Sequence, residues 1–309
     1  MNRSEQQATD AVSPGINREY VLDRCEYFVD VQVWPLHQVL DPAGWLENFR
    51  PEEMDYALHL LCGFIYFRHP MVDQLFLAAF QGLSSKVIED PLATDPRKAW
   101  NSFLDTVVVT RVTGEQPHDT DSGFHFMRKA RQLLGIPESR ILSPQHVIDR
   151  LASGSSFSVV FVDDFVGSGD QFTTTWERMT PVNNGRHTSF AELASTTCTA
   201  FYYCPIVCTQ AGLTVITRAC PGLSLLPAHI LPPAYSTLDE NSILWPVNLK
   251  AGATAFLQEA SARAGISAGS WKGYNDLGLA IGFEHSIPDA TLPLFSWKQG
   301  NWKPLIRQS

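Results

Sequence analysis

The sequence is poor in charged side chains and contains no long apolar run. Charged residues make up 18% of its 309 residues, below the roughly 25% of an average soluble protein. Apolar residues make up 44%, enough for a sizeable core, so a disordered or coiled-coil chain is excluded. No apolar segment approaches the roughly 18 residues of a membrane span. The segment Met1–Pro14 is too polar for a secretory signal. We therefore expect a cytoplasmic protein with no membrane partner.

Cysteine pairs of the CxxC type are also missing. Most of the six cysteines lie in apolar segments, which is typical of buried, reduced thiols. Cys204 and Cys208 lack the matching histidine or cysteine pair of a zinc site, so we predict no metal ligands. The net charge of −9 argues against non-specific nucleic-acid binding as the main activity.

The order of the expected elements divides the chain into four parts. Residues 1–15 are expected to be a flexible N-terminus, and residues 16–100 a helical part. Residues 101–220 are expected to form an α/β core, with residues 221–309 as a C-terminal extension packed on it. The pattern predicts an α/β fold with a mostly parallel sheet.

Local patterns place the individual elements. Apolar residues recur at helical spacing from Met54 to Ile65, and Arg68–Pro70 would end that helix and begin the next. The run Phe157–Val162 has the continuous apolar character of a strand buried on both faces. The remaining expected elements are strands at 106–110, 141–142 and 196–208 and helices at 121–134, 144–152, 173–179 and 251–264.

The segment after Phe157–Val162 carries the clearest chemical signal. Asp163 and Asp164 follow the apolar strand, and a small-residue turn, Gly167–Gly169, precedes the next helix. Successive amides of such a turn, at a helix N-terminus, suit a phosphate. Two carboxylates are suited to the two hydroxyls of a ribose. The segment therefore predicts a ribose 5-phosphate site.

An ordinary strand, turn and helix with an acidic N-cap is the alternative. Two acids directly after a wholly apolar strand are unfavourable without a ligand or a metal, which favours the binding interpretation. No lysine follows the glycines, so the segment is not a Walker A loop.

The same segment resembles the phosphoribosyl-pyrophosphate (PRPP) motif of type I phosphoribosyltransferases. Asp163 and Asp164 fall on the two acids of that motif, and Ser168 and Gly169 fall on its Thr-Gly pair. Two substrate-binding positions differ, since Asp170 and Gln171 replace a small residue and a threonine. Gly167 belongs to the same predicted phosphate loop. Asp170 would either bind Mg²⁺ or point outward.

Further segments extend the resemblance from about residue 50 to the C-terminus. They are Asp121–Gly123, Pro227–Leu231, Gly282–Pro293 and Trp302–Leu305, in that order. Together they resemble the phosphoribosyltransferase-like (PRTase-CE type) effectors of bacterial conflict systems, which include effectors encoded beside retron reverse transcriptases. The resemblance implies a type I phosphoribosyltransferase kind of sheet and a toxin in antiphage defence. It also implies a complex with a reverse transcriptase, its msDNA and ncRNA and a winged-helix protein as partners.

The resemblance also implies a pyrophosphate loop at Asp121, Ser122 and Gly123, with Mg²⁺ as cofactor. A simple helix N-cap is the alternative for these residues. Further candidates, each with an ordinary structural alternative, are Arg111, Arg128, His229, Glu284 and His285.

The predicted chemistry is transfer or hydrolysis at the anomeric carbon of ribose, with Asp163 and Asp164 as catalytic residues that fix the ring. The substrate would be PRPP or a nucleotide. Two other functions stay open at this point: a non-catalytic nucleotide- or PRPP-binding module, and a structural subunit of a defence complex.

Overall fold

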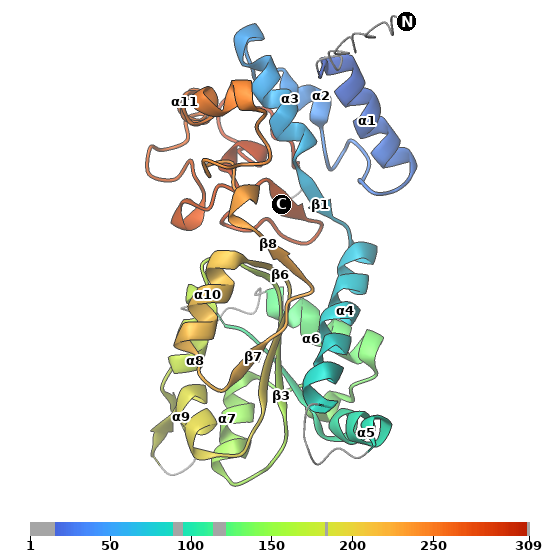
Figure 1. Ribbon diagram of the computed structural model, residues 1–309, viewed down its shortest axis with the longest axis vertical. Coiled ribbons are helices and arrows are strands. Elements are labelled where there is room, and N and C mark those ends of the chain that lie inside the picture. Colours follow the sequence, from blue (N-terminus) through green and yellow to red (C-terminus); the bar gives the residue numbers. More distant parts are fainter. Residues whose placement is uncertain (1–15, 89–94, 114–121, 183–184, 308–309) are drawn as a thin grey trace, which may run out of the picture.

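The computed structural model describes residues 16–88, 95–113, 122–182 and 185–307. Figure 1 shows a sheet with helices on both sides and, beyond the β8 end of that sheet, a second group of elements containing α1–α3, β1 and α11. The helices are α1 (Arg18–Asp30), α2 (Pro42–Leu46), α3 (Met54–Cys62), α4 (His69–Ile88), α5 (Pro96–Thr106), α6 (Ser122–Leu134), α7 (Pro144–Ala152), α8 (Asp170–Glu177), α9 (Phe190–Thr196), α10 (Gln210–Ala219) and α11 (Val247–Ala264). The strands are β1 (Ile65–Phe67), β2 (Val108–Arg111), β3 (Val159–Val166), β4 (Thr180–Pro181), β5 (His187–Thr188), β6 (Phe201–Thr209), β7 (Leu223–Leu225), β8 (His229–Leu231) and β9 (Ile281–Phe283).

The main sheet is parallel and has the order β2–β3–β6–β7, with β8 pairing beside β7 on the same edge of β6. Its central strands are largely apolar and buried on both faces, as is typical of parallel strands between two helical layers. The expected α/β fold with a mostly parallel sheet and N-terminal helices is therefore confirmed. β4 and β5 form a separate antiparallel pair.

Alternate residues of β3 pack against different helical layers. Val160 and Val162 belong to the core shared with α4, α5 and α6, whereas Val159 and Phe161 belong to the core shared with α7, α8, α9 and α10. The period of two along a strand produces this division. It also sends adjacent side chains near the end of β3 to opposite sides of the sheet.

A two-stranded parallel pairing joins distant parts of the chain, because Ile65 is paired with Ile281 and Phe67 with Phe283. The expectation that a helix continues through Ile65 is wrong. The helix α3 stops at Cys62, with Gly63 as its C-cap, and the chain becomes extended because residues far along the sequence supply a partner strand. The following helix begins at His69, one residue before the expected start at Pro70.

The predicted boundaries around the acidic segment also need correction. The strand β3 continues through Asp163 and Asp164 to Val166, and α8 already begins at Asp170. The acids therefore lie within the strand and not in a turn after it. The expected strand at 196–208 begins only at Phe201, since α9 occupies the residues up to Thr196.

The cysteine predictions are confirmed in part. Cys204 and Cys208 are buried in β6, and burial raises the pKa of the Cys208 thiol to about 12. Cys198 is exposed and departs from the expectation. Across the described segments, none of the helices has the length and apolar character to cross a bilayer.

Candidate functional site

A cavity of about 480 Å³ lies where β3 ends and α8 begins. One wall is the segment Asp164–Phe172, which contains the predicted phosphate loop, and Thr174 of α8. The opposite wall is the segment Ser286–Ala290 from the C-terminal part, with Tyr203 and Tyr274 completing the lining. The carboxyl end of parallel strands is where open α/β folds bind ligands.

The loop Gly167–Gly169 is held in place by the start of α10. The hydroxyl of Thr209 donates to the carbonyl of Gly167 at 2.6 Å, and a Cβ on Gly212 would lie 2.4 Å from the same carbonyl oxygen. Gly169 has a φ of +90° and caps α8, a conformation that favours glycine. The residues that the sequence marked as a phosphate loop therefore form a fixed turn at a helix N-terminus.

Asp170 connects the loop to the C-terminal part of the chain. Its Oδ2 accepts from the hydroxyl of Ser168 at 2.7 Å, from Nδ2 of Asn275 at 2.9 Å and from the hydroxyl of Tyr274 at 3.3 Å. This residue departs from the phosphoribosyltransferase pattern, and the structure gives it a definite contact. It joins the loop to Tyr274, which completes the cavity lining.

Asp163 and Asp164 lie on opposite faces of β3. Asp163 is buried, and its carboxylate accepts from the hydroxyl of Tyr203 at 3.3 Å and from the backbone amide of Asp164 at 3.0 Å. Burial, and then the Asp163 charge, raise the pKa of Tyr203 well above its ordinary value. Of the two acids, only Asp164 borders the cavity.

Asp164 contacts the C-terminal part of the chain on the other side of the sheet. Its Oδ2 lies 2.9 Å from Nε2 of His285 and accepts from the hydroxyl of Ser286 at 2.9 Å. Burial alone would raise the pKa of Asp164, but the contacts with His285 and Ser286 outweigh burial and hold the pKa below its ordinary value. Asp164 is therefore a carboxylate at neutral pH.

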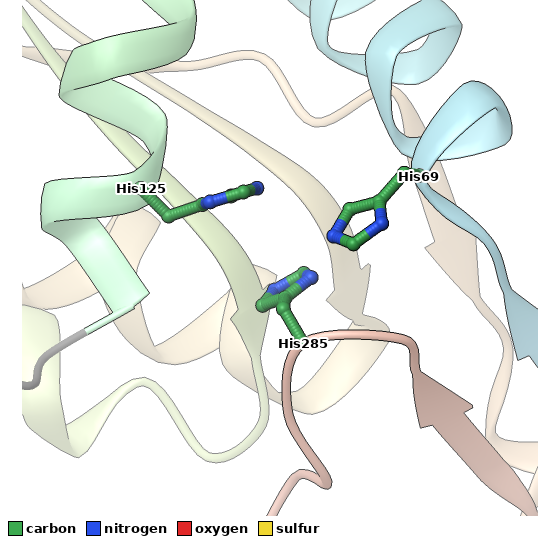
Figure 2. A group of neighbouring side chains, drawn as sticks. All are labelled: His69, His125 and His285. Atoms are coloured by element: carbon green, nitrogen blue, oxygen red, sulfur yellow. The ribbon is translucent and has the colours of Figure 1, made fainter. Parts of the chain in front are cut away.

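Three histidines gather beside Asp164. Figure 2 shows His69 at the start of α4, His125 on the first turns of α6 and His285 on the loop after β9, with their rings close together. A nitrogen from each ring lies within 4.8 Å of the other two. Burial first, and then the neighbouring Lys129, lower the pKa of His125 to about 4, so this ring is neutral at pH 7.

Glu284 belongs to this group and not to the cavity lining. Its Oε2 accepts from the backbone amide of His69 at 2.7 Å and lies 3.0 Å from Nδ1 of the same residue. The carboxylate thus stabilises the N-terminus of α4 and orients the His69 ring.

The remaining predicted residues are spread over the structure. Arg111 is buried in β2, with its guanidinium 4.0 Å from the ring of Phe124. Gly123 packs closely on β2, because a Cβ there would lie 2.6 Å from Cβ of Arg111. Arg128 is exposed on α6, and His229 is exposed on β8 outside the cavity lining.

The proposed pyrophosphate loop falls only partly on described residues. Asp121 lies outside them, and Ser122 is the first residue of α6. The role proposed for Asp121, Ser122 and Gly123 stays a prediction.

Sequence reasoning missed residues on both sides of Asp164. Tyr274, Ser286 and Asp289 line the cavity, while His69 and His125 complete the histidine group. Ser286 and Asp289 lie in a segment already quoted for the resemblance. No local pattern links His69 to His125, because the fold alone brings α4 and α6 together on one face of the sheet.

Comparison with known proteins supports the class that this fold and cavity suggest, a phosphoribosyltransferase-like protein. The family model PRTase-CE matches residues 42–308. The chain therefore belongs to the PRTase-CE family, as the sequence resemblance predicted.

No curated protein matches the chain. Among solved structures, the AQ2163 protein from Aquifex aeolicus matches with a TM-score of 0.27 and 12% identity, over 54% of this chain and 88% of that chain.

Proposed function

We propose that the cavity binds the ribose 5-phosphate part of PRPP or of a nucleotide, and that the protein acts on the bond at the anomeric carbon. One observation carries this proposal: the turn Gly167–Gly169, which leads into α8, lines the cavity at the carboxyl end of β3. Backbone amides at such a helix N-terminus are suited to a phosphate. Membership of the PRTase-CE family supports the same ligand class.

The chain's own residues would position the sugar and its leaving group. Asp164 borders the cavity and is ionised, so it is suited to accept hydrogen bonds from a ribose hydroxyl. Ser168 and the amides of the loop would hold the 5′-phosphate. Asp163 would act from the far face of β3, by fixing the backbone amide of Asp164.

The cavity also fits Mg²⁺. Its lining offers the carboxylates of Asp170 and Asp289 and contains no histidine or cysteine, and Mg²⁺ prefers oxygen ligands. When bound together with a pyrophosphate, the ion would stabilise the charge that develops on that leaving group. Asp289 is exposed at the rim of the cavity and is available for this role.

The biological role we propose is that of a toxin effector in a retron-type antiphage system. The partners would be a reverse transcriptase with its msDNA and ncRNA, and a winged-helix protein. The net charge of −9 suits a basic protein partner. Exposed aromatic side chains on α1, Tyr20 and Tyr27, are available for such a contact.

The test compares cells that express the wild type, Asp164→Asn or the exposed control Asp105→Asn on α5. Mass-spectrometric nucleotide profiles should show one nucleotide or PRPP falling in the wild type and in the control, and unchanged in Asp164→Asn. Circular dichroism establishes that each variant is folded. A folded Asp164→Asn protein that still depletes the metabolite would refute the assigned role.

A non-catalytic binding module is the second candidate. It is favoured by the hydrogen bonds that already engage Asp163 and Asp164 within the protein. In this case, calorimetry would detect binding of PRPP by the purified protein, and the ligand would be recovered unchanged after incubation.

A further inference from the structure

The histidine group His69, His125 and His285 is not part of the cavity lining and is not used by the proposed function. We propose that these three imidazoles bind a divalent transition-metal ion, and that this ion is Zn²⁺. The inference does not depend on ribose phosphate binding, although Asp164 contacts both regions.

The first argument is the convergence of ring nitrogens. The three residues come from α4, α6 and the loop after β9, yet one nitrogen of each lies within 4.8 Å of the others. Ligands at roughly 2.0–2.1 Å from a tetrahedral Zn²⁺ lie somewhat closer together than this. The rings of His69 and His125 are stacked on the ring of His285, so metal binding requires the side chains to turn and bring these nitrogens closer together.

The second argument is that two of these nitrogens are buried without a partner. Nε2 of His125 and Nδ1 of His285 are inaccessible to water and make no hydrogen bond. A buried polar atom without a partner is destabilising. Protonation of His285 would not remove the problem, because Nδ1 would then be a buried donor with no acceptor. A metal ion at the centre of the group satisfies both atoms at once.

The third argument is that carboxylates contact one ring nitrogen of His285 and one of His69, and leave the other nitrogen of each ring for the metal. His285 contacts Asp164 through Nε2 at 2.9 Å, so Nδ1 is the nitrogen left for a metal. His69 contacts Glu284 through Nδ1 at 3.0 Å, so Nε2 is left. Histidines that bind metals commonly donate their other ring N–H to a carboxylate, which fixes the ring and its tautomer.

Charge balance agrees with this assignment. Asp164 and Glu284 bring two negative charges to the group, Nε of Arg68 lies 3.9 Å from Oε2 of Glu284, and the nearby Lys129 is paired with Asp73. Imidazole ligands suit Zn²⁺ and related late transition metals, whereas Mg²⁺ prefers oxygen. The protein would thus hold two chemically different cation sites on either side of Asp164.

The test uses the full chain, produced without a histidine tag. Metal analysis by inductively coupled plasma mass spectrometry should find one Zn²⁺ per chain. After chelation, calorimetric titration with Zn²⁺ should recover that stoichiometry, and Zn²⁺ should raise the Tm. Co²⁺ in place of Zn²⁺ should give the visible absorption bands of four-coordinate cobalt.

His125→Gln should lose stoichiometric Zn²⁺, whereas His187→Gln, an exposed histidine on β5, should retain it. Asp164→Asn should weaken Zn²⁺ binding by about 10- to 100-fold, because it removes the carboxylate partner of a ligand. If a variant fails to fold, the calorimetric titration of the wild type with Zn²⁺ still tests the proposal. Folded wild type that neither contains nor binds Zn²⁺ would overturn the proposal, as would unchanged binding in folded His125→Gln. A failure to bind PRPP leaves it intact.

Discussion

Asp163 and Asp164 are adjacent in β3, but their side chains lie on opposite faces of the sheet and have very different surroundings. On the face toward α8, Asp163 meets the Tyr203 hydroxyl within a buried aromatic core. On the other face, Asp164 meets His285 and Ser286, which lie on a loop more than a hundred residues further along the chain. The first face connects elements within the sheet. The second connects the sheet to the C-terminal part. Residues from both faces line the cavity, Tyr203 from the first and Asp164 from the second.

The comparison shows that two neighbouring acids with the same local sequence context can have separate tasks. Successive side chains of a strand point to opposite faces of the sheet, and this separates the two acids. We expect Asp163 to act mainly on local stability and Asp164 to act on both stability and ligand binding. Three substitutions test this division, from the largest expected effect to the smallest.

Replacement of Asp164 by alanine should have the largest effect. The Asp164 and His285 side chains are 9% and 11% exposed, and removing a carboxylate that takes part in two such hydrogen bonds costs about 3 kcal/mol. Urea denaturation should show this loss of unfolding free energy. A loss below that for Tyr203→Phe would contradict the proposed difference between the two faces.

Gly169→Ala should have an intermediate effect. The φ of +90° at this position costs an alanine about 1–2 kcal/mol, and the altered turn should weaken PRPP binding measured by calorimetry. Gly82→Ala in α4 is the matched control, because a Cβ there meets no atom within 4 Å. It should stabilise the protein by roughly 0.5–1 kcal/mol and leave PRPP binding unchanged.

Tyr203→Phe should have the smallest effect. It removes one hydrogen bond of 3.3 Å to Asp163, worth about 1 kcal/mol, and keeps the ring stacked on Phe172. Thermal denaturation should show a small fall in Tm with Zn²⁺ binding unaltered. A loss of Zn²⁺ binding in this variant would mean that the two faces of β3 are coupled.

Much of the main sheet could be predicted from sequence, because its strands are apolar runs between helices with clear caps. Ser143, for example, was expected to cap α7, and its hydroxyl does accept from the amide of His146. The end of β3 could not be predicted. Asp163 and Asp164 remain in the strand because the backbone of β3 continues to pair with β6 beyond them. Tyr203 and His285 supply partners for the two carboxylates, and neither partner is apparent from the local pattern.

The candidate site, too, could be predicted only where a local sequence motif forms it. The glycine turn was evident as a local motif, and the structure places it on the cavity. The histidine group was not evident, since His69, His125 and His285 are far apart in the chain and each lies in an ordinary helical or loop context. Only the packing of α4 and α6 on one side of the sheet brings them together.

The pairing of β1 with β9 means that the cavity can be completed only late in the synthesis of the chain. The cavity wall at Ser286–Ala290 follows β9 directly, and β9 is held by a strand near the other end of the chain. During synthesis, the turn Gly167–Gly169 between β3 and α8 emerges from the ribosome long before that wall exists. A nascent or truncated chain that stops before β9 therefore lacks both the closed cavity and His285.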